Sequence, residues 1–77
     1  MDFVLEDAHN NVVGIEVKAT ATPRNDDVAG LRHLQDALGT RCIRCVLLCL
    51  CRDVVPFAAR LHALPLSMLW WMGAAPL

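Results

Sequence analysis

The stretch GIEVKAT, Gly14–Thr20, decides the fold, because it combines the alternation of a half-buried strand with an unusual pair of charges. Apolar residues occupy every second position from Val13 to Val17, the period of a strand with one face in a core. The other face carries Glu16 and Lys18, and Lys18 is the sole lysine of the chain. The strand therefore presents a carboxylate and the single ammonium group on one side.

A second alternating stretch, Asp2–Glu6, precedes this strand and is separated from it by residues of turn composition. We predict a β-hairpin over residues 2–19. Its two apolar faces coincide only if the numbers of paired residues sum to an even value, which requires a loop centred on His9. This register pairs Leu5 with Val13, Phe3 with Ile15 and Asp2 with Glu16.

The predicted register places the carboxylates of Asp2 and Glu16 side by side, with Lys18 next along the same face. Directly opposed like charges destabilise a sheet, so a divalent cation is expected to offset the repulsion. Mg²⁺ is commonly held by one or two carboxylates together with phosphate oxygens, and a lysine beside it stabilises phosphate charge. This pattern indicates phosphodiester hydrolysis. The alternative is a solvated hairpin face on which Glu16 and Lys18 form a weak surface ion pair.

The middle of the chain predicts a βαβ unit. Residues 25–39 read as a helix, with Thr22 or Asn25 as its cap and Gly39 as its stop. Residues 42–51 read as a buried strand that runs parallel to the second hairpin strand.

Residues 52–77 are expected to form a turn, a short edge strand and a short terminal helix docked through Leu66, Leu69 and Trp70. In the helix predicted over residues 25–39, the residues expected to face the core are Val28, Leu31, Leu34 and Leu38. His33 and His62 are expected on the surface.

Four cysteines lie within ten residues, and Cys42 and Cys45 have the C-x-x-C spacing of a zinc knuckle. On a strand, however, Cys45, Cys49 and Cys51 face one way and Cys42 the other. Cys45 and Cys49 would then be about 13 Å apart, at roughly 3.3 Å per residue. We therefore predict reduced, buried cysteines without a metal ion.

Composition bounds the class of protein. The 77 residues make one small domain or part of a larger one, and 56 % of them are apolar. A net charge of −1 gives no argument for a nucleic-acid partner. The acidic start does not resemble a signal peptide, and the uncharged C-terminal run is too short to span a bilayer. These features predict a cytoplasmic protein with no membrane partner.

The stretches DFVLED and VVGIEVKAT, beginning at Asp2 and Val12, resemble the Asp…Glu-x-Lys half of the PD-(D/E)XK nuclease-like superfamily. From Asp2 to Trp70 the chain is also similar to a C-terminal domain of unknown function in bacterial AAA-type ATP-binding proteins. That longer similarity includes DVAGLRHLQDALGTR and DVVPFAARLHALPLSMLW, which begin at Asp27 and Asp53. The resemblance implies a partial restriction-endonuclease-like α/β core over residues 1–77.

The same resemblance assigns roles to residues. It implies that Asp2 and Glu16 are metal ligands, that Lys18 is the catalytic-type lysine, and that Mg²⁺ is the cofactor. The superfamily core begins with a helix and a strand that precede the hairpin, so the chain is expected to be a truncated piece. It contains no G-x-x-x-x-G-K-[ST] phosphate loop, and hence no ATP site is expected. The cysteines depart from the family pattern.

Three hypotheses follow. The chain is a metal-dependent nuclease-like accessory domain, a non-catalytic module that binds protein or DNA, or a degraded gene fragment without an independent role. In each case the uncovered sheet edge and apolar face are expected to promote self-association. DNA is the expected partner of the first hypothesis, although the isolated chain is expected to be inactive.

Overall fold

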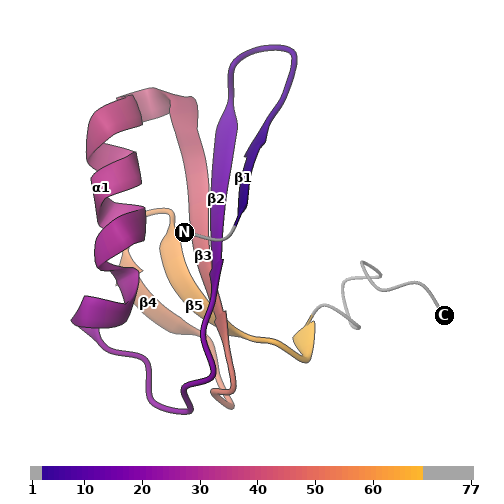
Figure 1. Cartoon of the computed structure of the whole chain (residues 1–77), viewed down its shortest axis with the longest axis vertical. Coiled ribbons are helices and arrows are strands. Elements are labelled where there is room, and N and C mark those ends of the chain that lie inside the picture. The colour runs from indigo at the N-terminus through magenta and orange to yellow at the C-terminus, as the bar shows by residue number, and fades with distance from the viewer. Residues whose placement is uncertain (1–2, 69–77) are drawn as a thin grey trace, which may run out of the picture.

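The computed structural model describes residues 3–68, in which one α-helix lies along one face of a five-stranded sheet (Figure 1). The strands are β1 (Phe3–Glu6), β2 (Val12–Val17), β3 (Cys42–Cys49), β4 (Val55–Ala58) and β5 (Leu61–Pro65). The helix α1 (Ala29–Leu38) is preceded by a 3₁₀ turn over Asn25–Val28 and followed by another over Gly39–Arg41.

The strand order in the sheet is β1-β2-β3-β5-β4. Strands β2, β3 and β5 are parallel, whereas β1 and β4 pair antiparallel with their neighbours and form the two edges. The path β2-α1-β3 is the predicted βαβ unit. The mixed sheet and single main helix confirm the predicted α/β class.

The hairpin has the register that parity predicts, since Phe3 pairs with Ile15 and Leu5 with Val13. Its turn is tied by Asp7, whose side-chain oxygens accept hydrogen bonds from the backbone N–H groups of His9 and Asn11 at 2.8 and 3.0 Å. Bonds from Asn11, followed by the one from His9, hold the pKa of Asp7 below its usual range. Asp2 lies outside the described residues.

The helix packs on the sheet through its predicted apolar stripe. Val28 and Leu31 are fully buried and belong to the hydrophobic core. Leu34 and Leu38 are partly buried and pack against that core. Gly39 follows the last residue of α1 with a φ of 57°, a conformation that favours glycine, as predicted for the stop. The predicted cap is wrong: the carboxylate of Asp27, rather than Thr22 or Asn25, accepts the backbone N–H of Arg24 at 2.8 Å.

Strand β3 differs from its prediction in two respects. It ends at Cys49 rather than Cys51, because the chain bends at Leu50. Cys42 faces the core on the same side as Cys45, not the opposite side. The cause is a register shift against β2, in which Val12 pairs with Cys42 and Val13 with Arg44, so that Ile43 is an extra residue.

The C-terminal part contains a strand that the sequence did not predict. Val55–Ala58 forms the expected short edge strand, but Leu61–Pro65 inserts between it and β3 as β5. Leu61 and Ala63 are fully buried, and the intervening His62 is half-buried with Nδ1 inaccessible, so its predicted surface position is wrong. His33 is exposed, as predicted. The terminal helix predicted after Pro65 lies only partly within the described residues, which end at Met68, and two of its docking residues, Leu69 and Trp70, fall outside them.

Candidate functional site

The candidate site lies where β2 ends beneath the start of the helix. Gly14 faces α1, because a Cβ added there would lie 2.6 Å from Cδ2 of Leu34. Glu16 follows two residues later and therefore points to the same side of the sheet. Its Oε2 atom lies 3.7 Å from the position that a Cβ on Gly30 would take. The Glu16 carboxylate thus reaches the first turn of α1.

Glu16 is half-buried, and its Oε2 atom is inaccessible with no hydrogen-bond partner among the described residues. Buried carboxylate oxygens normally accept hydrogen bonds, because removing a charged group from water without compensation is costly. An orphaned oxygen of this kind has the chemistry of a ligand for a hard cation.

Lys18 lies just beyond β2, where its backbone N–H donates to the carbonyl of Leu48 at 3.0 Å. Its Nζ atom lies 3.7 Å from Oδ1 of Asp27 in the 3₁₀ turn before α1. The other Asp27 oxygen, Oδ2, is the atom that accepts the Arg24 backbone N–H. Asp27 therefore links the lysine to the start of the helix, and both side chains stay partly exposed.

The structure thus places Glu16 and Lys18 at one end of the sheet and adds Asp27 to their surroundings. Asp27 belongs to an acidic first turn, a position that favours interaction with the positive end of the helix and does not by itself reveal a partner for Lys18. Within residues 3–68 no three His, Cys, Asp or Glu side chains form a metal-binding group. Asp2, the other predicted ligand, is outside that range.

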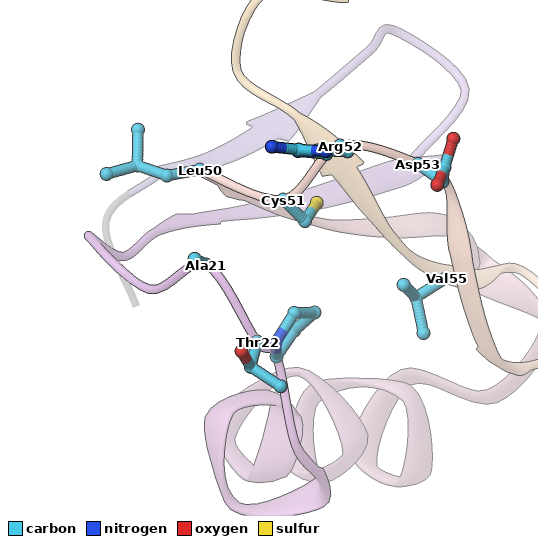
Figure 2. A pocket seen from close by; sticks show the side chains of 8 residues that line it. Ala21, Thr22, Leu50, Cys51, Arg52, Asp53 and Val55 are labelled. Carbon is cyan, nitrogen blue, oxygen red and sulfur yellow. The ribbon is translucent and has the colours of Figure 1, made fainter.

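A pocket of about 400 Å³ opens near the same end of the sheet, between the segment after β2 and the bend after β3 (Figure 2). Such positions beyond the carboxyl ends of parallel strands are where α/β sheets commonly bind ligands. Neither Glu16 nor Lys18 lines it. The lining residues are Ala21, Thr22, Pro23, Leu50, Cys51, Arg52, Asp53 and Val55.

All four cysteines are buried, as predicted, and each is a free thiol. They form two pairs, with Sγ–Sγ distances of 3.1 Å between Cys42 and Cys45 and 2.9 Å between Cys49 and Cys51. Burial, followed by the contact with Cys42, raises the pKa of Cys45 to about 12. Burial, followed by the contact with Cys49, raises the pKa of Cys51 to about 11. Both groups are therefore protonated at neutral pH.

Comparison with known families gives one result. Residues 1–69 match the family described as "Domain of unknown function (DUF4143)", and the chain belongs to that family. Comparisons with curated proteins and with solved structures found no match. Across residues 3–68, no helix has the length and apolar character needed to cross a membrane.

Proposed function

We propose that this chain is a nuclease-like accessory module whose Asp2, Glu16 and Lys18 form a Mg²⁺-dependent site for phosphodiester hydrolysis. The observation that supports it is the buried, unpartnered oxygen of Glu16 at the same strand end as Lys18. The resemblance of DFVLED and GIEVK to the PD-(D/E)XK pattern supplies the reaction class. The similarity of the chain to a C-terminal domain of AAA-type ATP-binding proteins supplies the proposed role as an accessory module of such proteins.

In this proposal Glu16 and Asp2 would hold the cation, which would supply Lewis-acid polarisation of a phosphate oxygen and a bound water of lowered pKa. Lys18 stabilises the negative charge of the phosphate through its ammonium group. Asp27 acts as a positioning residue, because its carboxylate restrains the lysine near the end of β2. DNA is the proposed substrate class.

The first test measures cation binding and not cleavage, because the isolated chain is expected to be inactive on DNA. The melting temperature of the purified chain is measured with increasing Mg²⁺ or Mn²⁺, with Ca²⁺ for comparison. At a concentration ten times the dissociation constant, binding adds about 1.4 kcal/mol of stability. For a domain of this size that corresponds to a rise of roughly 6–11 °C.

Glu16→Gln should abolish the cation-dependent rise, since it removes the charged ligand while keeping the side-chain shape. The matched control is Glu6→Gln on the same hairpin, where the carboxylate is exposed and pairs with Arg41 at 3.4 Å. The control should retain the full rise. An equal rise in both variants would contradict a cation site at Glu16.

Binding of DNA without any dependence on cations, unchanged in Glu16→Gln, would instead favour the non-catalytic interaction module. Cleavage of DNA by the isolated chain with Mg²⁺, lost on Lys18→Ala, would support the site and contradict the expectation that the chain is inactive alone.

A further inference from the structure

The cysteine pair Cys49 and Cys51 borders the pocket through Cys51, whereas neither Cys42 nor Cys45 lines it. Cys49 is the last residue of β3 and Cys51 lies two residues later, beyond the bend at Leu50. Their sulfur atoms are 2.9 Å apart, too far for a disulfide bond of about 2.05 Å but closer than ordinary contact between sulfur atoms. A small movement would bring them to bonding distance.

The backbone around this pair is held from both sides. The N–H of Leu50 donates to the carbonyl of Thr20 at 2.8 Å, and the carbonyl of Cys49 accepts the N–H of Leu66 at 2.8 Å. Side chains two apart on a strand share a face, and the bend brings these two together. Their proximity is therefore built into the connection between β3 and the residues that follow it.

The pocket borders one residue of the pair. Cys51 is 9 % exposed and lines the cavity of about 400 Å³, where Figure 2 shows its side chain between the Ala21–Thr22 segment and Val55. Cys49 is fully buried and does not line the cavity. Small reagents can thus meet Cys51 first, with Cys49 in position to complete a reaction begun there.

The first pair provides an internal comparison. Cys42 and Cys45 are 3.1 Å apart, yet both are fully buried and neither lines the pocket. The two pairs have nearly the same sulfur separation and differ in access.

We propose that Cys49 and Cys51 form a redox-active dithiol that closes to a disulfide by exchange with low-molecular-weight disulfides entering the pocket. The Cys51 thiolate attacks one sulfur of the small disulfide, forming a mixed disulfide and releasing one thiolate. The Cys49 thiolate then attacks the Cys51 sulfur and releases the second. Overall, two protein thiols lose two electrons and two protons, and the small disulfide becomes two thiols.

Exchange needs the thiolate, so the raised pKa of Cys51 makes this pair slow at neutral pH and faster in alkaline solution. In this proposal the dithiol is oxidised slowly by small disulfides and does not act as the catalytic centre of an oxidoreductase. The proposal is independent of the nuclease-like function, because Cys51 is not among the proposed hydrolytic residues.

The experiment uses the full chain, reduced and then incubated with excess oxidised glutathione at pH 8.5. Remaining thiols are blocked under denaturing conditions with N-ethylmaleimide, and tryptic peptides are analysed by mass spectrometry over time. Cleavage after Arg41, Arg44 and Arg52 separates CIR, with Cys42, from CVLLCLCR, with Cys45, Cys49 and Cys51. The expected product has a Cys49–Cys51 bond within the second peptide and blocked Cys42 and Cys45.

We expect the Cys49–Cys51 bond to form at least tenfold faster than any bond between Cys42 and Cys45. In Cys49→Ser, Cys51 should stop at the mixed disulfide with glutathione, and dithiothreitol should reverse both products. The wild-type chain is its own control for folding, since the comparison is made within one molecule. Persistence of four thiols, equal rates at the two pairs, or links between chains in place of Cys49–Cys51 would overturn the proposal.

Discussion

At the scale of single residues, Glu16 carries a cost that the described fold does not offset. One of its oxygens is buried and accepts no hydrogen bond from any group in residues 3–68. Replacing it with a side chain of similar length and no polar group should remove that cost. We predict that Glu16→Met raises the free energy of unfolding by about 1–3 kcal/mol in the absence of divalent cations.

Urea denaturation in the presence of a chelator measures this change. Glu6→Met is the control, because Glu6 is exposed and its replacement should change stability by less than about 0.5 kcal/mol. A loss of stability in Glu16→Met would mean that the carboxylate has a stabilising partner, and the argument for an open ligand position would fail.

The buried thiols predict a pH dependence. The pKa of Cys45 is about 12 and that of Cys51 about 11, both above the ordinary value of 9.0. The folded chain therefore binds more protons than the unfolded chain above pH 9, and stability falls as pH rises. The stabilisation is complete below pH 9 and is lost as pH rises through about 11 for Cys51 and about 12 for Cys45.

We expect the free energy of unfolding to fall by up to about 1.4 kcal/mol per pH unit for each thiol within this window. Denaturation curves at pH 8, 9, 10 and 10.5 test it. The double variant Cys45→Val, Cys51→Val should show a much shallower decline. Identical slopes in the two proteins would assign the alkaline loss to other groups.

At the scale of elements, the close approach of α1 to β2 depends on Gly14. A Cβ at this position would lie 2.6 Å from Leu34 Cδ2 and 3.3 Å from both Leu31 Cδ2 and the Cys45 sulfur. We predict that Gly14→Ala lowers the free energy of unfolding by about 1–3 kcal/mol through overpacking. Chemical denaturation measures the change.

Gly30→Ala is the matched substitution on the opposing element. Its added methyl group would meet only Glu16 Oε2 at 3.7 Å, an ordinary contact, and alanine favours a helix over glycine by up to about 1 kcal/mol. This variant should be as stable as the wild type or more so. The same loss at both positions would contradict the account based on the helix–sheet distance.

Local patterns were sufficient to predict the hairpin and the helix. Parity of the apolar positions determined which residues pair, as in Phe3 with Ile15, and Gly39 marked the end of α1. The same parity put Glu16 and Lys18 on one side of β2. Strand β5 was missed because Pro65 ends it and His62 interrupts its apolar residues, although Leu61 and Ala63 alternate as a strand should.

Features that depend on contacts between distant segments were not predictable. The ion pair of Lys18 with Asp27 and the pocket beyond β3 arise only when the segments after β2 and β3 meet. The side of the sheet taken by Cys42 was predicted wrongly because one extra residue at Ile43 shifts the register. A bulge of this kind leaves no mark in the alternation of apolar residues.

At the scale of the whole molecule, α1 covers one face of the sheet and no described element covers the other (Figure 1). The direction of the β2 side chains identifies this open face. Gly14 points towards the helix, so its neighbours Val13 and Ile15 point to the open side. Phe3 and Leu5 pair with those two residues and share their side. Their exposures are 56 % and 57 %, so a continuous apolar surface reaches the edge strand β1.

We predict that the purified chain self-associates. The contact surface on each copy is the edge strand β1 together with the open apolar face of the sheet. The outer edge of β1 has no partner strand within residues 3–68, and apolar side chains stand on both of its faces, since Val4 is also 53 % exposed. Unprotected edges of this kind pair with other chains, and a net charge of −1 gives little repulsion between copies.

Light scattering coupled to size exclusion, at several concentrations, gives the mass in solution. The double variant Phe3→Lys, Leu5→Lys should shift the chain to a monomer, because charges on an edge strand oppose pairing and disrupt the apolar surface. Val54→Lys serves as the control, since Val54 is exposed to 46 % but lies outside β1, and it should leave the mass unchanged. A monomeric wild-type chain at the highest concentration, or equal dissociation by Val54→Lys, would show that β1 and the adjoining face do not mediate association.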